Sequence, residues 1–328
     1  MKYLLLIILQ LNISIYLFGN QGGKFTSLEK ALENKDEVKH LDLSNQQLTE
    51  IPESVSQLTK LEELNISGNQ ISNLPSSLGN LKSLKILILG DPLQLKGGNK
   101  FKSIPEVVYE LTSLESLMLS RNQIQTISDN ISKLQNLKYL YLNDNAIKRL
   151  PEGIGELKNL KALFISRNAL VALPSSIGKM EGLETLDLKD NFLEQLPISL
   201  NDLKSLKSLE VQKNQIRKFS FNLDQLVNLQ SLILSDNPVK DLVLYGGDQS
   251  QLSMFVMSRT PLKELPESIW KLKSLKILDI SGNDLRRLDY VLLKNMNELL
   301  YLWLGGNSIL QEDIYEIKKR YPKVSVNL

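Results

Sequence analysis

The chain has 328 residues and no cysteine. A chain without thiols forms no disulfide, carries no cysteine nucleophile and offers no cysteine ligand to a metal. It has one histidine, His40, which we expect on the exposed side of a strand, and it lacks the G-x-S-x-G, H-E-x-x-H and phosphate-loop patterns of common catalytic centres. The sequence therefore predicts no enzyme, no cofactor and no bound metal.

Charge of one sign is also lacking. The 39 Lys and Arg residues nearly balance the 37 Asp and Glu residues, which leaves a net charge of +2. Proteins that bind polyanions usually carry a clear positive excess. We therefore expect no nucleic-acid partner.

What the chain does contain is one repeated motif, L-x-x-L-x-L-x-x-N-x-L-x-x-L-P-x-x-I-x-x-L-x-x, which can be followed in phase through twelve units. The units are 23 residues long, except for one step of 30 residues and a last step of 24. Their first apolar residues are Val38, Leu61, Leu84, Leu114, Leu137, Leu160, Leu183, Leu206, Leu229, Leu252, Leu275 and Leu299. A fixed period of this length predicts a single solenoid rather than two or three domains, because stacked repeats share one core.

Each half of the motif predicts a different element. Alternation at L-x-L predicts a short strand whose leucines point inward and whose middle residue points to the concave face. Apolar residues three apart in L-P-x-x-I-x-x-L predict a short 3₁₀ or helical turn on the convex side. A proline can open that turn because its missing N–H is not needed there. Proline occupies this place at Pro52, Pro75, Pro105, Pro151, Pro174, Pro197 and Pro266.

An asparagine stands where the chain reverses after each strand. Its amide can donate and accept hydrogen bonds where a buried turn leaves backbone groups without partners. The predicted asparagine ladder consists of Asn69, Asn122, Asn145, Asn168, Asn191, Asn214, Asn237, Asn283 and Asn307, with Gln46 and Thr260 as departures. Breaking it should cost about 1–3 kcal/mol per unsatisfied group.

This motif resembles the leucine-rich repeat family, in particular the bacterial 23-residue subtype of exported spirochaete proteins, and it is also similar to the Ras-group repeats of intracellular scaffolds. The resemblance covers most of the chain. It implies an α/β solenoid, a horseshoe with a parallel β-sheet on the concave face and short 3₁₀ or helical turns on the convex face. It also implies protein recognition, without naming a partner.

The two ends differ from the repeats. Residues 1–23 combine Lys2, a short apolar run and small residues from Gly19, as in a cleaved secretory signal peptide. An uncleaved signal anchor and a cytoplasmic protein are the alternatives. Thr26-Ser27-Leu28-Glu29 fits a capping box, so residues 24–37 predict an N-terminal capping helix ahead of the repeats in residues 38–310. Residues 311–328 predict a C-terminal cap with a helix and a last strand.

The expected concave positions contain two apolar groups. The N-terminal patch consists of Ile86, Ile88, Met118, Tyr139, Tyr141, Ala162 and Phe164. The C-terminal patch consists of Ile233, Met254, Val256, Ile277, Tyr301 and Trp303. An acidic break, Asp187 and Glu210, separates them. A contiguous exposed apolar patch usually marks a binding site, although aromatic contacts between strands can also serve only to stabilise a sheet.

Three further features are expected to modify this surface. The residue before the ladder asparagine alternates in sign, as Arg121, Asp144, Arg167, Asp190, Lys213, Asp236 and Arg259. We interpret this series mainly as an edge ladder of opposite charges. A seven-residue insertion in residues 90–98 is expected to bulge beside the N-terminal patch. Gly246 and Gln249 replace convex Ile and Leu anchors, which predicts a weak repeat.

Together these features predict an exported protein that binds a protein partner, on a host or another cell surface, through its concave face. A binder of cell-surface carbohydrate or glycosaminoglycan is an alternative, although Asp187, Glu210 and Asp279 would oppose a polyanion. A second alternative is an intracellular scaffold, which requires that the first 23 residues are not a signal peptide. A homodimer through the patch remains open, and membrane attachment is expected only through an uncleaved signal.

Overall fold

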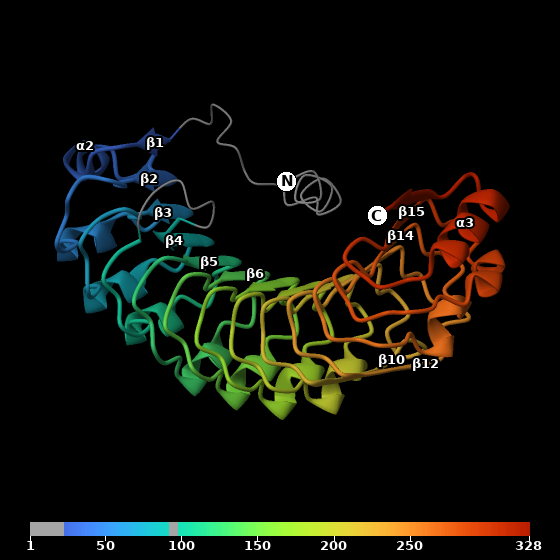
Figure 1. The fold of residues 1–328 in the computed structure, drawn as a ribbon. Coiled ribbons are helices and arrows are strands. Elements are labelled where there is room, and N and C mark those ends of the chain that lie inside the picture. The colour runs from blue at the N-terminus through green and yellow to red at the C-terminus, as the bar shows by residue number, and fades with distance from the viewer. Residues whose placement is uncertain (1–22, 92–97) are drawn as a thin grey trace.

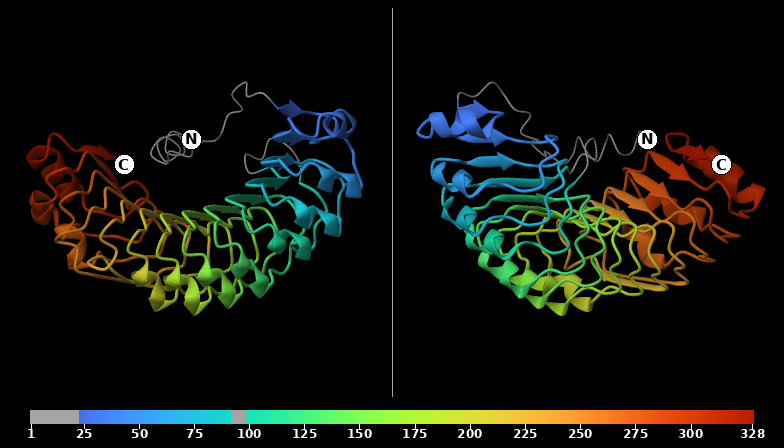
Figure 2. Two further views of the ribbon diagram at one scale, coloured as in Figure 1. Left: turned by 180° about the vertical axis from the view of Figure 1, so that it is seen from behind. Right: turned by 90° about the vertical axis from the view of Figure 1, so that its left-hand side faces the viewer.

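A computed structural model of the chain describes residues 23–91 and 98–328. These residues form an open horseshoe, with strands along the inner face and short helical turns along much of the outer face (Figures 1 and 2). The expected signal peptide lies outside the described residues except for Gly23, and so does most of the inserted stretch, residues 92–97.

The inner face is one parallel sheet of 14 strands in chain order. Twelve strands come from the twelve repeats, and β1 and β16 close the two ends. The strands are β1 (Lys24–Phe25), β2 (His40–Asp42), β3 (Glu63–Asn65), β4 (Ile86–Gly90), β5 (Ser116–Leu119), β6 (Tyr139–Tyr141), β7 (Ala162–Phe164), β8 (Thr185–Asp187), β9 (Ser208–Glu210), β11 (Ser231–Ile233), β13 (Met254–Val256), β14 (Ile277–Asp279), β15 (Tyr301–Trp303) and β16 (Ser325–Asn327). The predicted fold class is therefore confirmed.

Most repeats turn on the convex side through the predicted 3₁₀ segment. These segments are η1 (Glu53–Gln57), η2 (Ser76–Asn80), η3 (Glu106–Glu110), η4 (Asp129–Lys133), η5 (Glu152–Glu156), η6 (Ser175–Lys179), η7 (Ile198–Asp202), η8 (Glu267–Lys271) and η9 (Tyr290–Asn295). All seven motif prolines stand immediately before one of them, in extended conformation or close to it. The fixed φ of proline thus sets the entry to the turn.

Two repeats depart from the predicted convex turn. Their outer segments form a separate two-stranded parallel sheet, β10 (Lys218–Asn222) and β12 (Asp241–Tyr245). Both segments lack the motif proline, and their buried residues follow the period of two of a strand. In β10 the buried rings of Phe219 and Phe221 lie 4.6 Å apart between centroids.

This small sheet corrects the interpretation of the repeat that contains Gly246 and Gln249. Neither residue anchors the convex side. Leu242 of β12 holds the usual place of the motif leucine before the proline, and Leu244 is an additional buried residue. The chain leaves β12 through Gly246 and Gly247, which both have positive φ. The repeat is therefore anchored in part by a strand, and local weakness stays a prediction for residues 246–251.

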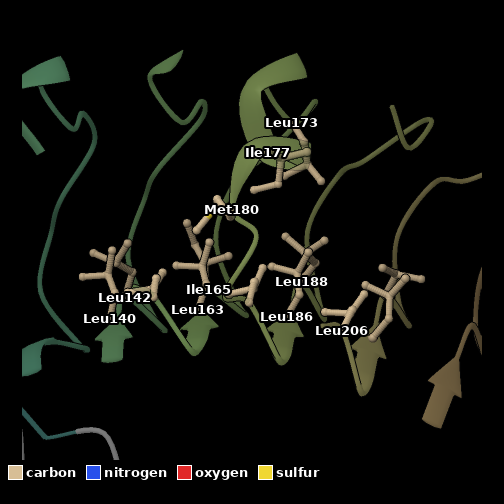
Figure 3. Close-up of a cluster of buried hydrophobic side chains, with 14 of the residues drawn as sticks. Leu140, Leu142, Leu163, Ile165, Leu173, Ile177, Met180, Leu186, Leu188 and Leu206 are labelled. Carbon is tan, nitrogen blue, oxygen red and sulfur yellow. The ribbon is translucent and has the colours of Figure 1, made fainter. Parts of the chain in front are cut away.

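The core runs without interruption under the whole sheet. Leucines at equal positions of successive repeats pair in register, as Leu163 does with Leu186, so their side chains stack along the solenoid. Figure 3 shows Leu140, Leu163 and Leu186 among such side chains, with Ile177 and Met180 covering them from the convex side. Each repeat buries its apolar residues mainly against its neighbours, which explains why the stack needs closed ends.

The asparagine ladder forms as predicted and includes Asn99 as well. Asn168 shows the common geometry, because its amide donates to Ile165 in its own repeat and to Leu142 in the preceding one. Its oxygen accepts from the backbone of Ile147. The Asn99 amide makes equivalent bonds, to Leu89 in its own repeat and Ile66 in the preceding one, and restores the repeat after the insertion. At one departure, the hydroxyl of Thr260 donates to the side-chain oxygen of Asn283.

The ends are closed by α2 (Leu28–Glu33) and α3 (Gln311–Arg320). Ser27 alone caps α2, through a bond from the backbone of Lys30, so the expected capping box starting at Thr26 is not formed. The helix and the last strand predicted within residues 311–328 are both formed, as α3 and β16. No helix within residues 23–91 and 98–328 has both the length and the apolar character needed to cross a lipid bilayer.

Candidate functional site

The concave face brings the N-terminal patch together across β4 to β7. Register pairs Met118 with Tyr141 and Tyr141 with Phe164, so the three side chains follow one another across adjacent strands. Tyr139 is exposed, at 37% of its surface, whereas Ile88 and Ala162 are buried by their neighbours on the sheet. The accessible part of this patch is therefore mainly aromatic.

Within this patch, Tyr141 and Phe164 are stacked, with ring centroids 4.8 Å apart and planes at 12°. Burial raises the pKa of the Tyr141 hydroxyl to about 12, with a smaller contribution from Tyr139. The hydroxyl therefore stays protonated and can donate a hydrogen bond at any physiological pH. The stack is a rigid apolar surface with one polar tip, a combination that is common at interface centres.

The C-terminal patch is less open than its sequence indicates. Met254 and Ile233 are buried, and the Ser231 hydroxyl donates to the Met254 sulfur at 3.7 Å. Tyr301 and Trp303 form its accessible end, where the two rings stack at 6.2 Å between centroids. Tyr301 is 45% exposed. The two patches are thus separate aromatic surfaces, one on each side of the acidic break.

The acidic break lies between them on β8 and β9. Asp187 and Glu210 are paired in register, so two carboxylates stand on adjacent strands, which are about 4.8 Å apart in a sheet. Burial, and then the charge of Glu210, raises the pKa of Asp187 to about 7. In the sequence these two residues only interrupt the apolar series, whereas the electrostatic conflict between them follows from their register.

The predicted edge ladder of alternating charge is formed in part. Arg167 pairs with Asp144, and Arg259 pairs with Asp236. All seven residues of the ladder have positive φ, between 52° and 58°. Glycine occupies the same place in other repeats, at Gly68, Gly282 and Gly306. Because a left-handed backbone is costly for residues with a side chain, the charged side chains are accommodated at some cost in strain.

A second charge ladder, which sequence analysis missed, runs along the opposite edge of the sheet. It uses the residue just before each strand, where Glu62 contacts Lys39 at 3.2 Å and Lys85 at 2.9 Å. Glu184 contacts Lys161 and Lys207 in the same way, at 3.3 and 2.6 Å. Hydrogen bonds from Lys85 and then Lys39 hold the pKa of Glu62 below its usual value. This alternation of lysine and glutamate occurs at one fixed position of the motif, so the sequence alone could have predicted it.

Other features add little chemistry. His40 is half-buried rather than solvent-facing, with Nδ1 3.1 Å from a Glu63 oxygen. A hollow of about 470 Å³ lies over the edge ladder of alternating charge, and the Phe192 side chain that lines it is 55% exposed. In the described part of the chain no group of three or more His, Asp or Glu residues could hold a metal ion.

Comparisons with known proteins agree with this architecture. A family model described as a leucine-rich repeat region matches residues 26–128 and 122–241, together more than half of the chain. No curated protein sequence matches the chain.

Solved structures similar to this chain include two bacterial proteins and a plant receptor. A leucine-rich repeat protein of Leptospira interrogans has 26% identity and a TM-score of 0.65, with 93% of this chain and 99% of that chain covered. An internalin of Listeria monocytogenes has 21% identity and a TM-score of 0.73, with 93% and 84% covered. A plant peptide hormone receptor, solved with the peptide RGF2, has 23% identity and a TM-score of 0.62, with 89% and 55% covered. The last two likenesses concern the fold alone.

Proposed function

Because the chain belongs to the leucine-rich repeat family, we propose that it is an exported module that binds a protein partner, on a host or other cell surface, through its concave face. The observation that carries this proposal is the stacked pair Tyr141 and Phe164 at the centre of the N-terminal patch. Aromatic side chains held rigid on an open face lose little conformational entropy on binding, and tyrosine is common among the residues that dominate interface energies.

A protein partner fits this surface better than a polyanion does. The two patches are apolar and aromatic, whereas the charges at both edges of the sheet alternate in sign. A glycosaminoglycan would need a basic stripe. The Leptospira and internalin structures belong to bacterial repeat proteins, and the plant receptor was solved with a peptide bound. Of these likenesses, the one to the plant receptor solved with a ligand supports recognition of a protein or peptide without identifying it.

Export is part of the proposal and rests on residues 1–23. We expect this segment to be removed, so that the mature chain starts with the cap of residues 24–37, continues through the repeats of residues 38–310 and ends with the cap of residues 311–328. Mature protein purified from its native cells should begin between Asn20 and Lys24, as read by mass spectrometry of its N-terminal peptide. Intact Met1 in a soluble cytoplasmic fraction would contradict export.

The binding face can be tested by photo-crosslinking from position 139, where the side chain is exposed. We expect a protein crosslink that disappears when Tyr141→Ala and Phe164→Ala are combined. Phe192→Ala is the matched control, since it removes an exposed ring outside the concave face. A crosslink that survives the double substitution would show that the two rings do not hold the partner, and a crosslink to a second copy of the chain would indicate a homodimer.

A further inference from the structure

The acidic break lies between apolar side chains at the centre of the concave face. Register places Phe164 beside Asp187 on one side and Ile233 beside Glu210 on the other. The order Phe164, Asp187, Glu210, Ile233 therefore runs across four neighbouring strands. A partner that covered both apolar patches would also have to cover the two carboxylates.

Hydrogen-bond acceptors outnumber donors at this place. Asp187 accepts from the backbone of Lys189 and lies beside the Ser166 hydroxyl, and Glu210 accepts from the Gln212 amide. Neither carboxylate forms an ion pair with a described residue, although Lys189 and Arg167 are near enough to act through charge. Both carboxylates can therefore take further donors.

Two buried oxygens close to the carboxylates also lack a hydrogen-bond partner among the described residues. They are the hydroxyl oxygen of Ser208 and the side-chain oxygen of Gln212. Ser208 has only 6% of its surface exposed and lies two residues before Glu210 on β9, so its side chain points to the same face. Buried polar atoms normally have partners, so these two oxygens leave hydrogen-bonding capacity unused next to the carboxylates.

We propose that the concave face recognises an arginine side chain of the protein partner, with its guanidinium bridging Asp187 and Glu210 and stacking on the ring of Phe164. This inference rests on the proposed function, because it assigns the chemistry of one contact on the same face. A guanidinium presents several donors in a planar fork, which suits two carboxylates on adjacent strands. Its flat face also suits the neighbouring phenyl ring.

Other cations fit the same place less well. A lysine ammonium is a compact charge that does not match two carboxylates at strand spacing as a planar fork does. A calcium ion takes six to eight oxygen ligands, and the break offers two carboxylates. Arginine also relieves the repulsion between Asp187 and Glu210, so its binding should release the proton that Asp187 holds near neutral pH.

The test uses N-acetyl-arginine amide as the probe and the mature chain at pH 8, observed by NMR titration of backbone amides. We expect the largest shifts at residues 187 and 210. The citrulline analogue, which has the same shape without the charge, should bind at least ten times more weakly. Combining Asp187→Asn with Glu210→Gln should weaken the arginine probe by a similar factor.

Asp279→Asn is the matched control, since Asp279 is a concave acid whose strand neighbours are Val256 and Trp303 rather than another acid. It should leave binding of the arginine probe unchanged. Arginine recognition is wrong if the probe does not bind, if the citrulline analogue binds equally, or if the double variant binds like the control while its circular dichroism stays native. None of these results affects crosslinking from position 139, so the two proposals can fail separately.

Discussion

Arg167 donates two hydrogen bonds to the carboxylate of Asp144 in the preceding repeat, at 2.5 and 2.7 Å, while both residues have a left-handed backbone. The pair joins two repeats at the edge of the concave sheet. Lys213 occupies the same place two repeats later but forms no ion pair with a described residue. The ladder thus contains left-handed residues that form an ion pair, such as Arg167, and at least one, Lys213, that forms none with a described residue.

This contrast predicts different effects of glycine at the two positions. Lys213→Gly should raise the free energy of unfolding by about 0.5–1 kcal/mol, because glycine adopts positive φ without a steric cost. Arg167→Gly gains the same relief but loses its ion pair, so it should be less stable than Lys213→Gly by about 0.5–1 kcal/mol. Urea unfolding of both variants measures the difference. A destabilised Lys213→Gly would mean that the left-handed position carries no strain.

The aromatic stack should contribute to stability as well as to binding. Tyr141→Ala and Phe164→Ala each remove half-buried ring surface, and a double-mutant cycle should give a coupling of about 0.5–1.5 kcal/mol from the stacked rings. Leu142→Ala, which empties a fully buried position beside them, should cost about 2–5 kcal/mol. The comparison is made by denaturant unfolding.

The aromatic variants should nevertheless stay folded. If their rings are central to the interface, the substitutions should weaken the free energy of partner binding by about 2 kcal/mol or more. Circular dichroism and partner affinity, measured on the same samples, separate the two effects. Unfolding of the aromatic double variant would make the stack primarily structural. Full-strength binding by a folded double variant would move the interface toward Tyr301 and Trp303.

Stability should depend on pH through Asp187. Its pKa in the folded chain is raised to about 7, above the value near 3.9 of an unfolded aspartate, so the folded state holds the proton more tightly. The stability that the protonated Asp187 carboxyl contributes is fully present below about pH 4 and is lost as the pH rises through about 7. Asp187→Asn should therefore raise stability at pH 8 and flatten the slope between pH 5 and 8.

Thermal unfolding at several pH values measures this slope. Asp279→Asn serves as the control because Asp279 has no acidic strand neighbour. An unchanged slope in Asp187→Asn would show that Asp187 is ionised across this range.

Local opening should be greatest where β12 ends. Residues 246–251 contain two glycines of positive φ and no convex anchor, while Leu242 and Leu244 just before them are buried. We expect amide hydrogen exchange to be faster in residues 246–251 than in residues 137–206. Protection of residues 241–245 should be intermediate, because β12 pairs only with β10. Equal protection of residues 246–251 and 137–206 would contradict this assignment.

Much of the architecture could be predicted from the sequence because each repeat uses local rules. A period of two at L-x-L specifies the strand, proline before the convex segment specifies the entry to a 3₁₀ turn, and asparagine supplies the bonds that a buried turn needs. Twelve similar units adopt similar conformations and stack on one another, so the parallel sheet and its register follow from the period.

Only the tertiary structure determined the features that depend on contacts between residues of adjacent repeats. Ile88, Ala162 and Met254 occupy concave positions, yet adjacent strands cover them, which the pattern of one strand does not reveal. The convex sheet of β10 and β12 likewise needed two consecutive repeats without the motif proline. Asp187 and Glu210 become a shared electrostatic site only because register sets them on adjacent strands in partly desolvated surroundings, where like charges cannot both be well solvated.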